Sequence, residues 1–395
     1  MARTLFPVLA LAVSLAAGVA PAQAPKPAED RDLQAIRVRM QATLEELRAQ
    51  ASFPGVSVGF VLADGRSAGV ACGLADVENK VPLVPTDRLL AGSVGKMFVA
   101  AVTLQLVEEG RLALDDRAET WIGKEPWFGR LPNAPELTVR SLLNHTAGLP
   151  EYFERKGVAE AIKADVDREW TAADRLAFVL DAKPRFAVGK GWAYADTHYI
   201  VAGLIAEKAG GKPLFEQVED RLLKPLELGG IVPSNRRTIP GLVAGYADPR
   251  NPLGFDGRTV TGGKLMMNPQ VEWAGGGLAT TPQDLARWAK LLFEGRAFRK
   301  KETLEAMLDG VDTTAGRGGA NGPRYGLGVQ ILASAWGPSF GHGGWFPGYR
   351  TEVAYFPDKK VAIAIQFNTD ITASLEKGVS TYLADMARIV LEPRK

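Results

Sequence analysis

The chain of 395 residues contains a single cysteine, Cys72, and only three histidines. One cysteine cannot form a disulfide within the chain, so the folded state must be stabilised by its core alone. Three separated histidines and no cysteine pair argue against a metal centre, and we expect neither a metal nor a cofactor. The net charge is only +2 and no basic stripe is present, so nucleic-acid binding is not predicted.

The N-terminal apolar run is too short for a membrane span, which needs about 20 apolar residues. Arg3 precedes the run from Leu5 to Ala20, and Ala22-Gln23-Ala24 matches a small-x-small cleavage pattern. An uncleaved anchor is the alternative. We predict that residues 1–24 are a signal peptide cleaved after Ala24, which leaves a periplasmic or secreted protein.

What the sequence does contain is a glycine-rich turn with Ser93 and Lys96, followed by an apolar stretch to Val107. On a helix, residues three apart share a face, so the hydroxyl and the amine can share a hydrogen bond. Burial favours an uncharged amine, the form that acts as a base and activates a serine nucleophile. A helix N-cap serine with a surface lysine is the alternative, and the same spacing recurs at Ser374 and Lys377. The apolar stretch favours a helix buried on most sides, where a lysine needs a partner.

The two ends of the chain carry the strand patterns, and the middle carries helical ones. Strands are predicted at 56–62, 68–74, 325–332, 339–341, 349–356 and 361–368, and terminal helices at 33–47 and 375–389. Between residues 115 and 323, helices are predicted at 139–143, 171–180, 199–209, 214–223 and 282–293, with a long loop at 235–269.

The economical solution is an α+β fold with one antiparallel sheet formed from both chain ends and flanked by helices. A mostly helical domain is inserted into it. We predict that residues 25–110 and 320–395 form the sheet domain and that residues 111–319 form the insertion. Ser93 then lies at the seam between the two, a favoured place for a small-molecule site.

Three further stretches hold candidate polar residues. His145 ends a helix before Gly148 and is either a base or a capping residue. Tyr194 and Asp196 lie on a loop that opens a helix, where Asp196 is a candidate N-cap. His342 lies between glycines on a strand, and such glycines let a ligand approach the backbone.

These stretches together closely resemble the serine β-lactamase and penicillin-binding-protein-like hydrolase family, especially its class C β-lactamase, DD-peptidase and esterase branch. The resemblance runs from about residue 35 to about residue 390. The motifs occur in this order: Ser93-x-x-Lys96, Leu-Leu-Asn-His-Thr-Ala-Gly-Leu at 142–149, Tyr194-x-Asp196, Ala-Gly-Gly-Gly-Leu-Ala-Thr-Thr-Pro-Gln-Asp-Leu-Ala-Arg-Trp at 274–288, and His342-Gly343-Gly344.

The resemblance implies a β-lactamase/transpeptidase-like fold and an acyl-enzyme mechanism on Ser93. Lys96 and Tyr194 would transfer the protons, with the lysine ammonium lowering the pKa of the phenol or the reverse, and either could be the acylation base. The backbone N–H groups of Ser93 and Trp345 would form the oxyanion hole.

Two residues depart from the family pattern. Asp196 stands where many β-lactamases have asparagine, and His342 stands where lysine is common, so a cation is not assured there. Both changes weaken the case for efficient β-lactamase activity, and Arg350 is a candidate contact for a substrate carboxylate. The strand with His342, Gly343 and Gly344 would line the substrate, which Asp196 would also contact.

The sequence thus predicts an exported serine hydrolase for a small-molecule or peptide substrate: an ester, an amide or a D-amino-acid peptide. DD-carboxypeptidase-like or esterase-like activity is expected, with weak β-lactamase activity at most. One alternative is a catalytically idle family member that binds cell-wall fragments or a protein partner. Another is an α/β-hydrolase with a nucleophile elbow at Ala91-x-Ser93-x-Gly95 and a triad through His342. No oligomeric state is predicted.

Overall fold

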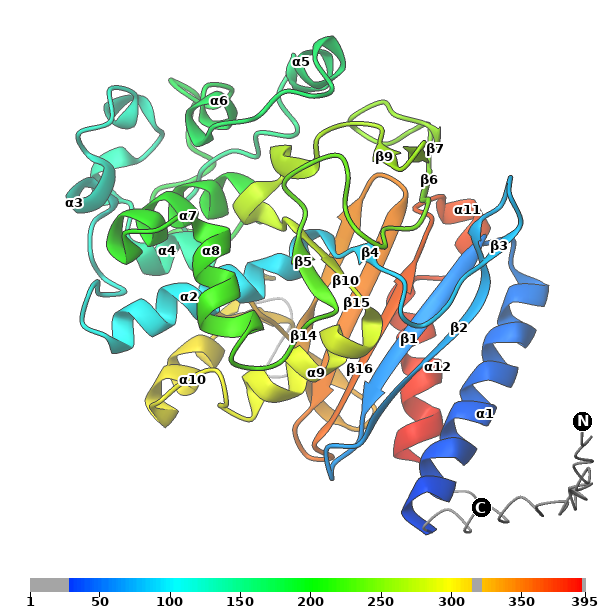
Figure 1. The fold of residues 1–395 in the computed structure, drawn as a ribbon. Coiled ribbons are helices and arrows are strands. Elements are labelled where there is room, and N and C mark those ends of the chain that lie inside the picture. Colours follow the sequence, from blue (N-terminus) through cyan, green and yellow to red (C-terminus); the bar gives the residue numbers. More distant parts are fainter. Residues whose placement is uncertain (1–27, 315–321, 393–395) are drawn as a thin grey trace, which may run out of the picture.

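A large antiparallel sheet runs through the centre of the molecule (Figure 1). The computed structural model describes residues 28–314 and 322–392, so the predicted signal peptide at 1–24 lies outside the described residues. Within them, the sheet has nine strands in the order β11-β12-β13-β14-β15-β16-β1-β2-β3. These are β1 (Gly55–Val61), β2 (Ser67–Asp76), β3 (Val81–Pro82), β11 (Val311–Asp312), β12 (Arg324–Tyr325), β13 (Gln330–Ser334), β14 (Gly337–Phe346), β15 (Tyr349–Phe356) and β16 (Val361–Phe367).

The two chain ends meet where β1 pairs with β16, with Val58 opposite Ile365. Alternate apolar side chains of β1, Val56, Val58 and Phe60, are buried in one core with the two terminal helices, because successive side chains of a strand point to opposite faces. Those helices, α1 (Ala28–Gln50) and α12 (Val379–Leu391), lie side by side along this face (Figure 1). The predicted α+β fold with a sheet from both chain ends is confirmed.

Helix α9 (Pro282–Phe293) covers the opposite face of the sheet, against β1, β15 and β16. It connects the sheet to the helical region, because Trp288 of α9 stacks on Phe98 with ring centroids 4.2 Å apart. Phe98 belongs to α2 (Lys96–Glu108), which is buried on most sides as its apolar sequence predicted. Helix α9 thus packs on the sheet although it lies within the predicted insertion, residues 111–319. The predicted domain boundaries stay a prediction.

The helical region stands to one side of the sheet (Figure 1). Its α-helices besides α2 are α3 (Ala118–Ile122), α4 (Val139–Leu143), α5 (Val158–Ala164), α6 (Ala172–Leu176), α7 (Asp196–Gly210), α8 (Leu214–Val218) and α10 (Lys301–Leu308). The short helix α11 (Thr372–Leu375) precedes α12. In the part of the chain that the structure describes, no helix is both long and apolar enough to cross a membrane.

Short strands also occur outside the large sheet. One small sheet joins β4 (Leu89–Leu90), β10 (Leu278–Thr280) and β5 (Ile231–Pro233). The loop predicted at 235–269 contains two small hairpin-like pairs, β6 (Tyr246–Ala247) with β7 (Gly257–Arg258) and β8 (Val260–Thr261) with β9 (Lys264–Leu265).

The single strand predicted at 325–332 is wrong, because the chain leaves the sheet between β12 and β13. There, the backbone N–H of Leu327 donates to the Met307 carbonyl at 2.9 Å, and that of Gly328 donates to the Leu143 carbonyl at 3.2 Å. These donors are therefore not available to a neighbouring strand. The helix predicted at 171–180 is also shorter, since α6 ends at Leu176.

The turn before α2 is pressed against strand β14, and glycines make this contact possible. A Cβ atom added at Gly344 would lie 1.9 Å from the Ala91 carbonyl oxygen. A Cβ added at Gly95 would lie 1.8 Å from the carbonyl oxygen of Gly276. The sequence before α2 is therefore held between the sheet and the loop before β10.

We expect Gly344→Ala to destabilise the protein by about 1–3 kcal/mol, the usual cost of overpacking, because the new methyl group meets a backbone carbonyl. Gly343→Ala is the matched control, since its Cβ would meet no atom closer than 4.0 Å. The measurement is urea unfolding of both variants beside the parent chain. Equal stability of the two variants would contradict this description of the seam.

Candidate active site

Ser93 lies on a short 3₁₀ helix, η1 (Gly92–Gly95), immediately before α2. Gly92 has φ of +53°, and a Cβ added to it would lie 2.5 Å from the backbone nitrogen of Trp345. Only a glycine therefore allows this close approach. It brings the backbone of η1 next to the Trp345 N–H, the pair of positions predicted for the oxyanion hole.

Lys96 is the first residue of α2 and its side chain is completely buried. Its Nζ donates to Ser93 Oγ at 3.0 Å, and also to Asp196 Oδ1 and to the carbonyl oxygen of Gly275. An ammonium has three N–H donors, so all three are used. The predicted Ser93–Lys96 hydrogen bond is present, and the alternative of a surface lysine is wrong.

Asp196 lies at the start of α7, but it does not cap the helix. The N-cap residue is Ala195, and the Asp196 carboxylate is turned to Lys96 in an ion pair. The backbone N–H of Asp196 instead donates to Glu151 Oε2. The prediction of an N-cap is therefore corrected: Asp196 is the counter-ion of the buried lysine, and Glu151 satisfies the helix end.

The Tyr194 hydroxyl is buried and makes no hydrogen bond of ordinary geometry among the described residues. Lys96 Nζ lies 4.8 Å from the centroid of its ring. Burial raises the pKa of Tyr194 well above its usual value, the Asp196 charge raises it further, and the nearby Ser93 side chain opposes the rise. The expected lowering of the phenol pKa is thus wrong in direction, and Tyr194 is a neutral phenol.

Two buried glutamates near Lys96 were not predicted from the sequence. Glu151 Oε1 accepts from the Phe153 N–H at 3.0 Å, and Glu272 Oε2 accepts from the Gly277 N–H at 3.0 Å. Burial, and then the charge of Asp196, raise the pKa of each glutamate to about 8. The only sequence signal was position, since Glu151 lies two residues after the motif at 142–149 and Glu272 lies two residues before the one at 274–288.

The histidines are buried and uncharged. His145 Nδ1 lies 2.9 Å from His198 Nδ1, and burial lowers the pKa of His198 and of His342 to about 3. His342 Nε2 lies 2.8 Å from the Tyr325 hydroxyl, and its Nδ1 lies 2.6 Å from the Gly343 carbonyl oxygen. Both nitrogens of His342 are therefore used within the protein, and the ring supports strand β14 instead of supplying a cation.

A cavity of about 510 Å³ opens over Ser93. Among the predicted site residues, those that line it are Ser93, Tyr194, His342, Gly343, Gly344, Trp345 and Arg350. Lys96 and Asp196 do not line it, because they lie behind Ser93 in the buried cluster. Trp345 Nε1 donates to Asp370 Oδ2 at 2.7 Å, which fixes that side chain at the cavity wall. Residues 28–314 and 322–392 contain no group of three or more side chains suited to a metal ion.

The raised pKa of Glu272 predicts a stability that falls with pH. An unfolded glutamate loses its proton near pH 4.3, whereas the folded one keeps it to about pH 8. Between these values the folded state holds the extra proton, so raising the pH favours unfolding, by up to about 1.4 kcal/mol per pH unit. Glu272→Gln removes this contribution.

Urea unfolding between pH 5 and pH 8 measures the effect. We expect a shallower decline for Glu272→Gln than for the parent chain, with Glu305→Gln as the control, since Glu305 forms an exposed ion pair with Lys301. Identical pH slopes for all three proteins would contradict a protonated Glu272.

Comparison with known proteins places this site in a family. The β-lactamase family model matches residues 40–387. A D-aminopeptidase of Brucella anthropi is 27% identical over 81% of this chain and 57% of its own length. The esterase EstB of Burkholderia gladioli is 33% identical over 40% of this chain and 41% of its own. The chain thus spans only about half the length of these curated relatives.

A solved structure is similar to this chain over nearly the full length of the solved protein. A D-stereospecific amidohydrolase from Streptomyces is 28% identical, with a TM-score of 0.72 over 86% of this chain and 97% of the other. The alternative of an α/β-hydrolase is excluded, because the parallel sheet of that fold differs from the antiparallel sheet observed. The chain therefore belongs to the β-lactamase family, a family of serine hydrolases, as its ordered motifs predicted.

Proposed function

We propose that the protein is an exported serine hydrolase that forms an acyl-enzyme on Ser93 and cleaves amides, esters or short peptides of D-amino acids. The observation that carries the proposal is the hydrogen bond from the buried Lys96 to Ser93. Ser93 itself lines a cavity large enough for a small substrate. The names of the relatives, a D-aminopeptidase, an esterase and a D-stereospecific amidohydrolase, support this choice of substrates. Export is part of the proposal and rests on the N-terminal pattern alone.

Lys96 takes the Ser93 proton in this proposal. The Lys96 ammonium already donates to three acceptors, so Lys96 must first give up one of its protons. Asp196 can take that proton, because its carboxylate is in contact with Lys96 Nζ. A Lys96 proton passes to Asp196, the Ser93 proton passes to Lys96, and Ser93 Oγ bonds to the substrate carbonyl carbon. This relay uses the carboxylate that distinguishes the chain from relatives with asparagine.

Tyr194 serves as the proton donor to the leaving group. Its raised pKa makes a phenolate base unfavourable at neutral pH. The proton held on Asp196 returns through Lys96 and Tyr194 to the leaving amine or alkoxide, so the charges of the site are restored after acylation. Water then hydrolyses the acyl-enzyme by the same groups in reverse.

The oxyanion forms between the backbone N–H groups of Ser93 and Trp345, where two donors stabilise developing negative charge. The close approach of Gly92 to Trp345 holds these donors together. Because His342 is uncharged, Arg350 is the cation on this wall for a substrate carboxylate. This arrangement favours amides and esters over efficient β-lactam turnover.

A fluorophosphonate probe tests the nucleophile. We expect the protein to gain one probe mass on Ser93, since the probe captures activated serines, and we expect Ser93→Ala to gain none. Intact-mass measurement followed by peptide mapping reads out both results. Absence of any adduct on the parent chain would overturn the proposal and favour the idle family member that binds cell-wall fragments or a protein partner.

A further inference from the structure

His145 lies between helix α4 and Gly148, where the sequence predicts either a base or a capping residue. The C-cap of α4 is Asn144, and the His145 side chain does not line the cavity over Ser93. Burial lowers the pKa of the imidazole well below its usual value. His145 is therefore a neutral ring buried behind the site, and neither predicted role fits these surroundings.

The backbone of His145 holds the loop that leads to Tyr194. Its φ of +63° lies in the left-handed region, which is uncommon for residues other than glycine. In this conformation the His145 carbonyl oxygen accepts from the Ala193 N–H at 3.2 Å, and the next carbonyl, of Thr146, accepts from the Gly189 N–H at 2.9 Å. A strained backbone persists only where its surroundings determine it, and such positions cluster at functional sites.

The side chain of His145 contacts Tyr194 and its neighbour. His145 Nδ1 accepts from the backbone N–H of Ala195 at 3.4 Å, so His145 bonds the residues on both sides of Tyr194. The His145 and Tyr194 rings are tilted against each other, with their centroids 4.3 Å apart. Tyr194 is thus held by His145 through the backbone and through the ring.

His198 determines which nitrogen of His145 carries the proton. The Leu149 N–H donates to His198 Nε2 at 3.1 Å, and a neutral imidazole has one N–H, so the His198 proton is on Nδ1. That N–H donates to His145 Nδ1, 2.9 Å away. His145 therefore carries its own proton on Nε2, and its Nδ1 is the acceptor that Ala195 requires.

The His145 Nε2–H has no hydrogen-bond partner among the described residues, although it is buried. The rings around it are those of Tyr194, Tyr199 and Tyr325. An unpaired buried donor costs free energy, and an apolar side chain would not carry this cost. The histidine therefore has both a strained backbone and an unpaired donor. Such local costs are expected where a functional requirement outweighs them.

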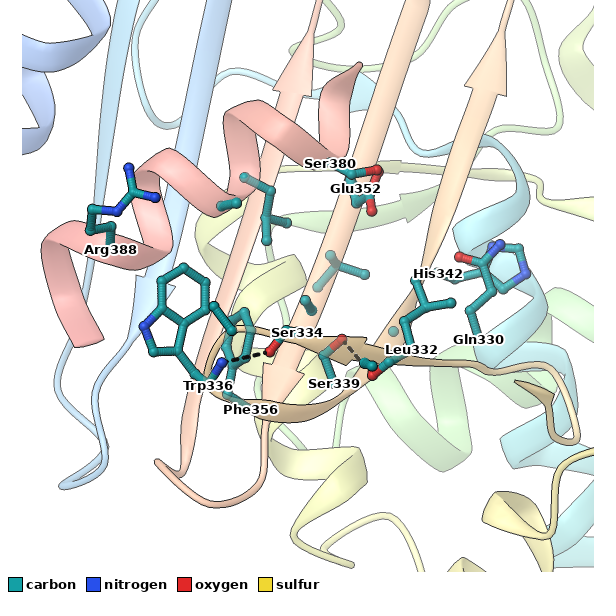
Figure 2. A pocket seen from close by; sticks show the side chains of 17 residues that line it. Gln330, Leu332, Ser334, Trp336, Ser339, His342, Glu352, Phe356, Ser380 and Arg388 are labelled. Atoms are coloured by element: carbon teal, nitrogen blue, oxygen red, sulfur yellow. Dashed lines mark hydrogen bonds between the residues drawn. The ribbon is translucent and has the colours of Figure 1, made fainter. Parts of the chain in front are cut away.

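The ring cluster also reaches the strand beside the substrate cavity. The Tyr325 ring lies 4.8 Å from that of His145, and its hydroxyl lies 2.8 Å from His342 Nε2. His342 lines the catalytic cavity and a neighbouring groove of about 270 Å³, where Figure 2 shows it beside Gln330. Through Tyr325, His145 is thus packed between the loop of Tyr194 and strand β14.

We propose that His145 is a positioning residue for Tyr194. Its unprotonated Nδ1, maintained by His198, holds the Tyr194 hydroxyl where it protonates the leaving group. The inference rests on the proposed function, in which Tyr194 is that proton donor. His145 itself transfers no proton and does not touch the substrate. Its loss should therefore slow each substrate in proportion to the need of the leaving group for a proton.

Two esters that form the same acetyl-enzyme test the proposal. p-Nitrophenolate leaves p-nitrophenyl acetate without a proton, whereas the strongly basic alkoxide of p-nitrobenzyl acetate has to be protonated. The measured quantity is the kcat/KM of the first ester divided by that of the second, in which the amount of folded enzyme cancels. His145→Leu should raise this ratio by about 10- to 100-fold, the effect of a misplaced catalytic group. Tyr194→Phe should raise it at least as much.

Two further variants separate the role of Nδ1 from general damage. His145→Asn keeps an acceptor on Cγ and suits a positive φ, so its ratio should lie closer to that of the parent chain. Lys80→Leu places a leucine at a φ of +54° on an exposed residue, and it should keep the parent ratio.

A parent-like ratio in His145→Leu, or equal increases in His145→Leu and His145→Asn, overturns the inference and leaves the proposed function standing. An unchanged ratio in Tyr194→Phe overturns the role of Tyr194 as the proton donor, and the inference with it. Failure to hydrolyse either ester, together with no Ser93 adduct, overturns the proposed function itself.

Nitrogen-15 NMR tests the proton positions without any substitution in the protein measured. The chain has only three histidines, and long-range proton–nitrogen correlations distinguish protonated from unprotonated ring nitrogens. We expect His145 to be protonated at Nε2, and His198 and His342 at Nδ1; the spectrum of His145→Asn assigns the missing ring. A His145 ring protonated at Nδ1, or charged at neutral pH, would overturn the inference.

Discussion

The buried ammonium of Lys96 is the constraint on which the site depends. A buried charge costs several kcal/mol unless it is paired and hydrogen-bonded, and Lys96 meets this requirement with acceptors from three separate segments. These are Ser93 before α2, Asp196 at the start of α7, and Gly275 at the end of the short 3₁₀ helix Trp273–Gly275 that precedes β10. The charge that orients the nucleophile therefore also joins the helical region to the turn that lies against the sheet. Catalysis and folding share this interaction.

The second consequence is an unusual charge balance around the nucleophile. Asp196 forms an ion pair with Lys96. Burial, and then the charge of Asp196, raise the pKa of Tyr194, Glu151 and Glu272. The buried imidazole of His342 is neutral as well. One ion pair in a cluster of neutral acids is suited to moving a proton over short distances without exposing a new charge. Because His342 supplies no positive charge, a cation for substrate recognition has to come from another residue of the cavity wall, such as Arg350.

Part of this arrangement could be predicted from the sequence, and the rest could not, for physical reasons. The Ser93–Lys96 contact follows from helical spacing, and the sheet follows from the alternation in strands such as β1, because both are local patterns. The Lys96–Asp196 ion pair joins residues 100 positions apart, and local capping rules gave Asp196 a different role. Glu151 and the neutral state of His342 depend on burial by distant elements, which periodicity does not reveal. The order of the motifs was enough to identify the family, but it did not reveal which side chains of the site are charged.

The most direct test of the account is the acylation rate of Asp196→Asn, measured by the burst of p-nitrophenol released from p-nitrophenyl acetate in stopped flow. An amide cannot take the proton that Lys96 must give up, so the account predicts a burst slower by about 10²-fold or more, the usual contribution of a proton acceptor. Asp181→Asn, which breaks an exposed ion pair with Arg130, serves as the control and should acylate at the parent rate. An Asp196→Asn variant that acylates as fast as the parent chain, or faster, would contradict the proton relay from Ser93 through Lys96 to Asp196.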